Sequence, residues 1–167
     1  MQTINKPSEA SKTPTQRFFD VIDFGSKTLG LDVPQIVKIE TLRAMPEGSF
    51  GRAWAEFLDD NHLDPLTNGP RRKQLHDGVH VLTGYGSDLV GEAQVQAFMI
   101  GAKWEPANAA VLLTILRGAR RHGVTIAWET LIEAYQRGRR ALFEPDRWPA
   151  EKLWDLPLSC VRTCMNL

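Results

Sequence analysis

Residues 75–98 constrain the fold of this chain more than any other stretch. They read LHDGVHVLTGYGSDLVGEAQVQAF, two helix-like segments separated by a glycine-rich break. His76 and His80 lie four positions apart, so on a helix they differ by only ~40° and can bind one ion together. The glycines of the break permit a sharp turn, and Gly91 has no side chain to keep two helices apart. The stretch therefore predicts two helices folded back on each other around a histidine pair.

Two carboxylates extend this histidine pair into a candidate metal site. Glu92 stands in a largely apolar segment, where an unpaired carboxylate would cost several kcal/mol unless a cation offset that cost. Asp77 lies ~60° from His80 around the helix, close enough to act as a ligand or to orient one. We therefore predict that His76, Asp77, His80 and Glu92 are both the metal ligands and the catalytic residues. Two imidazoles and two carboxylates suit one divalent ion, with zinc expected and iron, manganese or magnesium as alternatives.

The rest of the chain predicts an all-α protein. Apolar residues recur at helical spacing, and no segment alternates strongly enough to indicate a strand. We expect a helix to open at Asp32, with Pro34 in its first turn. Residues 1–13 are polar and predict a disordered tail, and residues 14–167 predict a single helical metal-binding domain. The expected fold is one compact multi-helix bundle.

Charge and hydropathy exclude several classes of protein. The 20 basic and 20 acidic side chains balance, which argues against a general nucleic-acid binder. No apolar run approaches the ~20 residues that span a bilayer, and no secretory signal or clear transit peptide is visible. We expect a cytoplasmic protein, or one held peripherally at the inner face of a membrane. Residues 108–116 are apolar nearly all round, so we expect them in the core or against a lipid-like ligand.

Three segments resemble one known family. The string HDxxH, followed after eleven residues by Glu92 with the turn LTGYG between, resembles the metal motif of the coenzyme Q biosynthesis protein four family. Residues 45–58, MPEGSFGRAWAEFL, look like a second segment of that family, and residues 138–158 are similar to its tail. The resemblance covers residues 45–160. The metal motif is specific to this family when Glu92 is counted, and it is a weak signal without Glu92.

This resemblance implies a role in ubiquinone biosynthesis. It implies divalent-metal-dependent decarboxylation and hydroxylation of a polyprenylated hydroxybenzoate ring, a lipid-binding scaffold for the biosynthetic complex, or both. A metal-dependent lyase is thus favoured over a non-catalytic protein. The implied partners are a polyprenyl or other long-chain lipid or quinone precursor, the surface of a membrane, and a homo-oligomer or biosynthetic complex. Residues 89–98 and 111–116 would enclose the prenyl tail.

Two alternatives stay open. One is a metal-dependent phosphohydrolase of the His-Asp type, which also uses adjacent His and Asp residues on a helix. That class needs a further histidine upstream, for which His62 is available, and a further aspartate downstream, for which Asp146 and Asp155 are candidates. The other is a non-catalytic prenyl-lipid carrier, in which the metal only ties two helices together.

Overall fold

A computed structural model describes residues 32–167, which form eight α-helices, one short 3₁₀ helix and no strand. The all-α expectation is therefore confirmed for this part of the chain, whereas the expected tail at residues 1–13 lies outside the described residues. In chain order the elements are α2 (Ile39–Arg43), α3 (Phe50–Asp60), α4 (Arg71–Gln74), α5 (His76–Thr83), α6 (Leu89–Ala102), α7 (Pro106–Arg121), α8 (Trp128–Arg140), the 3₁₀ helix η2 (Ala150–Lys152) and α9 (Leu158–Cys164).

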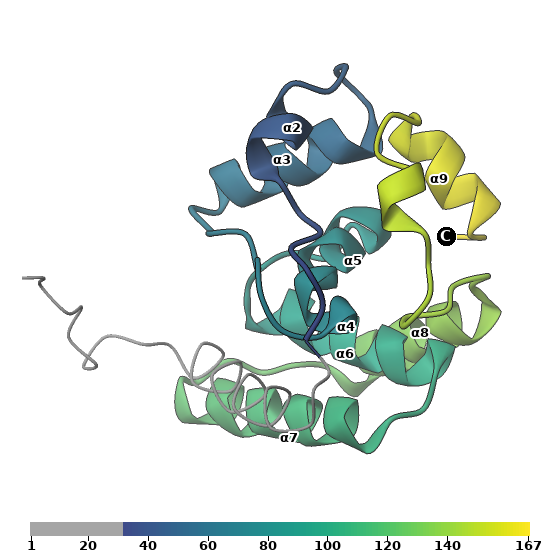
Figure 1. The fold of residues 1–167 in the computed structure, drawn as a ribbon. Coiled ribbons are helices and arrows are strands. Elements are labelled where there is room, and N and C mark those ends of the chain that lie inside the picture. The colour runs from purple at the N-terminus through teal and green to yellow at the C-terminus, as the bar shows by residue number, and fades with distance from the viewer. Residues whose placement is uncertain (1–31) are drawn as a thin grey trace, which may run out of the picture.

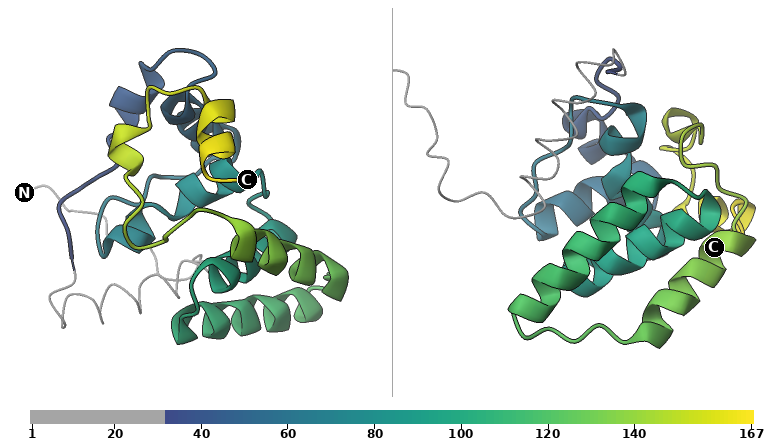
Figure 2. Two further views of the ribbon diagram at one scale, coloured as in Figure 1. Left: turned by 90° about the vertical axis from the view of Figure 1, so that its right-hand side faces the viewer. Right: turned by 90° about the horizontal axis from the view of Figure 1, so that it is seen from below.

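Helix α5 lies in the middle of the bundle (Figure 1). Helices α2, α3 and α9 lie on one side of it, and α6, α7 and α8 lie on the other, as the views in Figure 2 also show. A first apolar core joins α3, α5 and α9 through side chains such as Trp54, Val79 and Val161. A second, smaller core joins α6, α7 and α8. Because protein packs around it, every residue of α5 is buried.

Helices α6 and α8 meet through backbone atoms. A Cβ placed on Gly138 would lie 2.0 Å from the carbonyl oxygen of Phe98, and one on Gly101 would lie 2.1 Å from that of Tyr135. Only hydrogen atoms fit at these two positions, so the helices can approach until their main chains touch. This close contact fixes how α6, which carries Glu92, sits in the bundle.

We expect Gly138→Ala to lower the free energy of unfolding by about 1–3 kcal/mol, because the added methyl group forces α6 and α8 apart. Gly118→Ala on α7 is the matched control, since a Cβ there would meet nothing within 4 Å. The control should be neutral or gain up to about 1 kcal/mol from helix propensity. Urea denaturation monitored by circular dichroism measures both. Equal stability of the two variants would contradict this account of the α6–α8 contact.

The prediction of a helix that begins at Asp32 is wrong for residues 32–38, because α2 begins only at Ile39. The buried side chain of Gln74 explains the difference. Its carbonyl oxygen accepts a hydrogen bond from the Ile36 N–H at 2.8 Å, and its amide donates to the carbonyls of Val33 and Gly69, both at 3.1 Å. These bonds satisfy backbone groups of a segment outside any helix or strand, which therefore does not need to be helical.

The apolar run on α7 is not fully buried in the core, which was the first of the two positions expected for it. Val111, Leu112 and Leu116 are only partly buried where they pack against the second core, and Leu113 is 46% exposed. The run therefore covers one face of the bundle rather than filling its interior. Within residues 32–167 no helix combines the length and the apolar character needed to cross a membrane.

Candidate metal centre

The candidate site lies where α5 and α6 meet across the turn at residues 84–88. Helix α5 ends at Thr83 and is capped by Gly84, whose φ of +76° is the left-handed conformation that glycine adopts at little cost. Asp88 then caps α6, with its carboxylate accepting a hydrogen bond from the Gly91 N–H at 2.7 Å. This short connection folds α6 back over α5 and brings Glu92, in the first turn of α6, above the two histidines.

Three potential ligand side chains converge at this point. The Nε2 atoms of His76 and His80 are 3.2 Å apart, and Glu92 places one carboxylate oxygen, Oε2, 3.3 Å from the first and the other, Oε1, 3.6 Å from the second. In a tetrahedral zinc site with bonds of about 2.0–2.1 Å, the ligand atoms lie about 3.3 Å from one another. The spacing and the chemistry of the donors therefore fit a divalent ion. Elsewhere in residues 32–167 no other cluster of three such side chains has comparable spacing.

Burial makes this group electrostatically unusual. His76 and His80 are 7% and 2% exposed, and the Glu92 side chain is 16% exposed. Burial raises the pKa of Glu92, but the neighbouring histidines outweigh it and hold that pKa well below its ordinary range. Burial likewise lowers the pKa of His76, but the charge and hydrogen bond of Glu92 leave it raised overall. The site thus favours a carboxylate together with a positive charge, supplied either by a proton or by a metal ion.

Asp77 is the predicted site residue that the structure does not bring into this group. Consecutive residues on a helix point ~100° apart, so Asp77 cannot share the direction of His76. Its carboxylate is not one of the three converging donors, although Asp77 is buried and desolvation raises its pKa. Its role as a direct ligand stays a prediction, and its position is that of a neighbour to the histidines.

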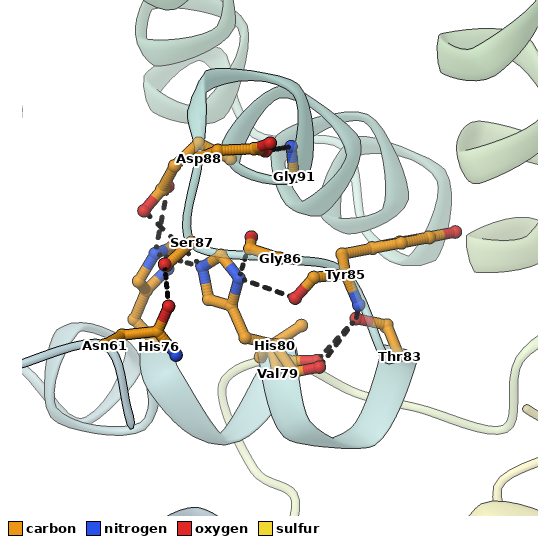
Figure 3. Close-up of polar contacts among 11 residues, drawn as sticks. Asn61, His76, Val79, His80, Thr83, Tyr85, Gly86, Ser87, Asp88 and Gly91 are labelled. Carbon is orange, nitrogen blue, oxygen red and sulfur yellow. Dashed lines mark hydrogen bonds and ion pairs between the residues drawn. The ribbon is translucent and has the colours of Figure 1, made fainter. Parts of the chain in front are cut away.

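The sequence did not predict what holds the His80 ring. The ring Nδ1 lies 2.9 Å from the carbonyl oxygen of Gly86 and 3.2 Å from that of Tyr85 (Figure 3). The Phe57 ring from α3 stacks against the imidazole with centroids 5.4 Å apart and an interplanar angle of 22°. The only sequence signal for these contacts was the glycine-rich turn itself.

Two arginines stabilise the end of α5 that follows His80. Arg137 of α8 donates to the carbonyl of Thr83 at 2.7 Å, and Arg162 of α9 donates to those of Leu82 and Val81 at 2.9 and 2.8 Å. Positive charge near a helix C-terminus is favourable, and here Arg137 supplies it to a helix other than its own. Helices α8 and α9 therefore both help to anchor α5.

The residues required by the phosphohydrolase alternative are not part of the site. Asp146 forms ion pairs with Arg72 and Lys103. His62 and Asp155 are exposed, and none of the three contributes to the converging donors. A pocket of about 300 Å³ exists between the end of α7 and residues 123–126, but it shares no residue with the His–Glu group. Among residues 32–167, the converging donor side chains thus lie at the α5–α6 junction.

Comparisons with known proteins point to one family. Residues 33–143 match the family model described as "Coenzyme Q (ubiquinone) biosynthesis protein Coq4". The mitochondrial ubiquinone biosynthesis protein COQ4 homologue of Bos taurus is 30% identical over 136 residues, which cover 72% of this chain and 51% of that protein. The homologue of Xenopus tropicalis is 32% identical over 126 residues, which cover 61% and 41%. The chain thus spans about half the length of these relatives, or less.

A crystal structure shows the same fold. A candidate ubiquinone biosynthesis protein from Nostoc punctiforme superposes with a TM-score of 0.63, at 17% sequence identity, over 89% of this chain and 77% of its own. At this identity the match concerns the fold alone. It agrees with the all-α arrangement of residues 32–167.

Proposed function

This chain belongs to the Coenzyme Q (ubiquinone) biosynthesis protein Coq4 family, and we propose that it acts in ubiquinone biosynthesis through a divalent metal held by His76, His80 and Glu92. One observation carries the proposal, namely the convergence of three side chains, with 3.2 Å between the Nε2 atoms of His76 and His80 and 3.3 and 3.6 Å from these atoms to the two carboxylate oxygens of Glu92. Two imidazoles and one carboxylate leave further coordination positions open, as in catalytic rather than structural sites. We take zinc as the expected ion and iron, manganese or magnesium as alternatives.

The proposed substrate is a polyprenylated hydroxybenzoate, which loses its ring carboxylate as CO₂ while a proton takes its place on the ring. Hydroxylation of that carbon is a further two-electron oxidation, so it would also require dioxygen as oxidant and a redox-active ion such as iron in place of zinc. A bound divalent cation supplies Lewis-acid stabilisation for a carboxylate or phenolate oxygen. The protein contributes the remaining features. Phe57 and the backbone of the turn orient His80, the buried setting of α5 excludes water, and Glu92 stays ionised because the histidines hold its pKa low.

A decarboxylation assay tests this activity. The purified full chain, loaded with zinc, iron or manganese in turn, is incubated with prenylated 4-hydroxybenzoate carrying a ¹³C carboxylate. We expect release of labelled CO₂ with at least one metal, and loss of that release in Glu92→Gln. If no metal supports release above that of the variant, the catalytic part of the proposal fails and the scaffold role is favoured.

Lipid binding is the second part of the proposal, and exposed apolar side chains on α7 and α8 favour it. Leu113 is 46% exposed, and Trp128, Ile132 and Tyr135 form an exposed stripe at helical spacing on α8. On α6, by contrast, Val95 and Phe98 lie in the protein core, so that helix offers less surface to a prenyl tail than the sequence suggested. We propose that a prenyl chain lies against the exposed apolar side of α7 at Leu113. Peripheral membrane contact, a cytoplasmic location and assembly with other copies or enzymes stay predictions.

We expect Leu113→Gln to weaken binding of a fluorescent prenyl probe about tenfold or more, because burying a leucine against an apolar chain is worth about 1.5–3 kcal/mol. Thr114→Gln, at the next exposed position of α7, is the matched control and should bind the probe as the wild type does. Metal content should be unchanged in both variants, since the ligands lie on α5 and α6. Equal binding by the two variants would place the lipid elsewhere.

A further inference from the structure

The turn at residues 84–88 determines which nitrogen of His80 is free to bind a ligand. The Nδ1 atom faces two backbone carbonyl oxygens, those of Gly86 at 2.9 Å and Tyr85 at 3.2 Å. Carbonyl oxygens only accept hydrogen bonds, so Nδ1 must carry the proton. The lone pair of the neutral ring then lies on Nε2, which is the atom that faces His76 and Glu92. Without these carbonyls, nothing in the turn would favour this tautomer over the other.

The position of the Gly86 carbonyl depends in turn on Gly91. A Cβ on Gly91 would lie 1.9 Å from that same carbonyl oxygen, 2.5 Å from its carbon and 2.7 Å from the Gly86 nitrogen. Real Cβ atoms do not come this close to backbone, so any side chain at position 91 must displace the peptide that holds His80. The Gly91 N–H also donates to the Asp88 carboxylate at 2.7 Å, which binds the turn to the first turn of α6 (Figure 3).

We propose that Gly91 is a positioning residue for the metal centre. It lets the first turn of α6 press against the turn at residues 84–88, so that the Gly86 carbonyl stays on Nδ1 and His80 presents a bare Nε2. The sequence had suggested that Gly91 serves the approach of two helices. In the structure it instead serves the approach of α6 to a carbonyl oxygen in contact with the site. The part of this inference that concerns affinity rests on the proposed metal function, whereas the part that concerns the tautomer does not.

Gly101 provides a matched control on the same helix. Its Cβ would lie 2.1 Å from the Tyr135 carbonyl oxygen, a clash of nearly the same severity as that of Gly91. It faces α8, however, and not the turn. Both Gly91→Ala and Gly101→Ala should therefore lower stability, but only Gly91→Ala should alter His80. This difference separates a positioning role from a general packing defect.

The test compares the full-length wild type, Gly91→Ala and Gly101→Ala. Zinc affinity is measured by competition with a chromophoric chelator, and the ring nitrogens of His80 are observed by ¹⁵N NMR. We expect Gly91→Ala to lose about 10–100-fold in zinc affinity, the range typical for groups that orient a ligand, and Gly101→Ala to retain it. In protein stripped of metal at about pH 9, above the ordinary imidazole pKa of ~6.5, wild-type His80 should carry its proton on Nδ1.

The outcomes distinguish this inference from the proposed function. If the wild type binds no divalent ion, the proposed function fails, and the ring nitrogens still decide the role of Gly91. A neutral wild-type His80 with its proton on Nε2 would overturn the inference, and this measurement stands even if Gly91→Ala does not fold. A folded Gly91→Ala with unchanged zinc affinity and an unchanged His80 tautomer would also overturn it. Equal loss of affinity in Gly101→Ala would assign the effect to packing.

Discussion

Replacing Glu92 by glutamine is expected to lower the affinity for a divalent ion more than about 100-fold. Groups that merely orient a ligand contribute 10–100-fold, and Glu92 is the one carboxylate in the converging set. Glutamine keeps the volume of the side chain and removes its charge, so the loss reports on coordination and not on a cavity. Metal content after dialysis, measured by mass spectrometry, should fall from about one ion per chain to a small fraction of that.

Two variants complete this experiment. His80→Ala should remove the ion as Glu92→Gln does, because it deletes another of the three donors. Glu133→Gln, at an exposed position on α8, loses the same charge away from the site and should keep the metal. If Glu92→Gln still holds one ion per chain after dialysis while folded, the assignment of Glu92 as a ligand is wrong.

Acidification should release the metal over the range in which imidazole is protonated. Imidazole must be neutral to bind a metal, and Glu92 raises the pKa of His76 above its ordinary 6.5 despite the opposing effect of burial. Competition by one proton costs about tenfold in affinity per pH unit below the pKa, so we expect a fall of roughly 10–100-fold between about pH 7.5 and 5.5. Chelator competition at the two pH values measures it, and an unchanged affinity would mean that the histidines are not ligands.

The same pKa shifts predict the opposite trend in the stability of protein stripped of metal. Because the folded pKa of His76 is raised, its pairing with Glu92 stabilises fully below the unfolded value of 6.5 and is lost as pH rises through the folded value. The folded pKa of Glu92 is lowered, so its contribution is present above 4.5 and is lost as pH falls toward the folded value. Zinc should therefore raise the melting temperature more at about pH 7.5 than at about pH 5.5.

The sequence predicted the centre of this molecule well because local rules determine it. Four-residue spacing placed His76 and His80 on one side of α5, and an apolar segment made an unpaired Glu92 costly enough to suggest a partner. Because the glycine-rich break between the two helices is only five residues long, α6 was expected to fold back against α5. These signals depend on neighbours in sequence, and the structure confirms that the three side chains meet.

Contacts between distant segments could not be predicted in this way. Gln74 hydrogen-bonds residues 33–36, which are not helical although a helix was expected to begin at Asp32. Arg162 reaches the end of α5 from α9, about half the chain away. The carbonyls that hold His80 belong to backbone whose course depends on the contact between Gly91 and Gly86. In each case tertiary packing determines the partner. The residue types of neighbouring positions in the sequence do not predict it.

Anomalous diffraction from crystals grown with zinc tests the central claim most directly. Data collected on either side of the zinc absorption edge locate the ion without reference to any activity or substrate. We expect one anomalous peak per chain, within bonding distance of Nε2 of His76, Nε2 of His80 and the carboxylate of Glu92. The absence of a peak among these three side chains, or a peak bound only by residues elsewhere, would contradict it.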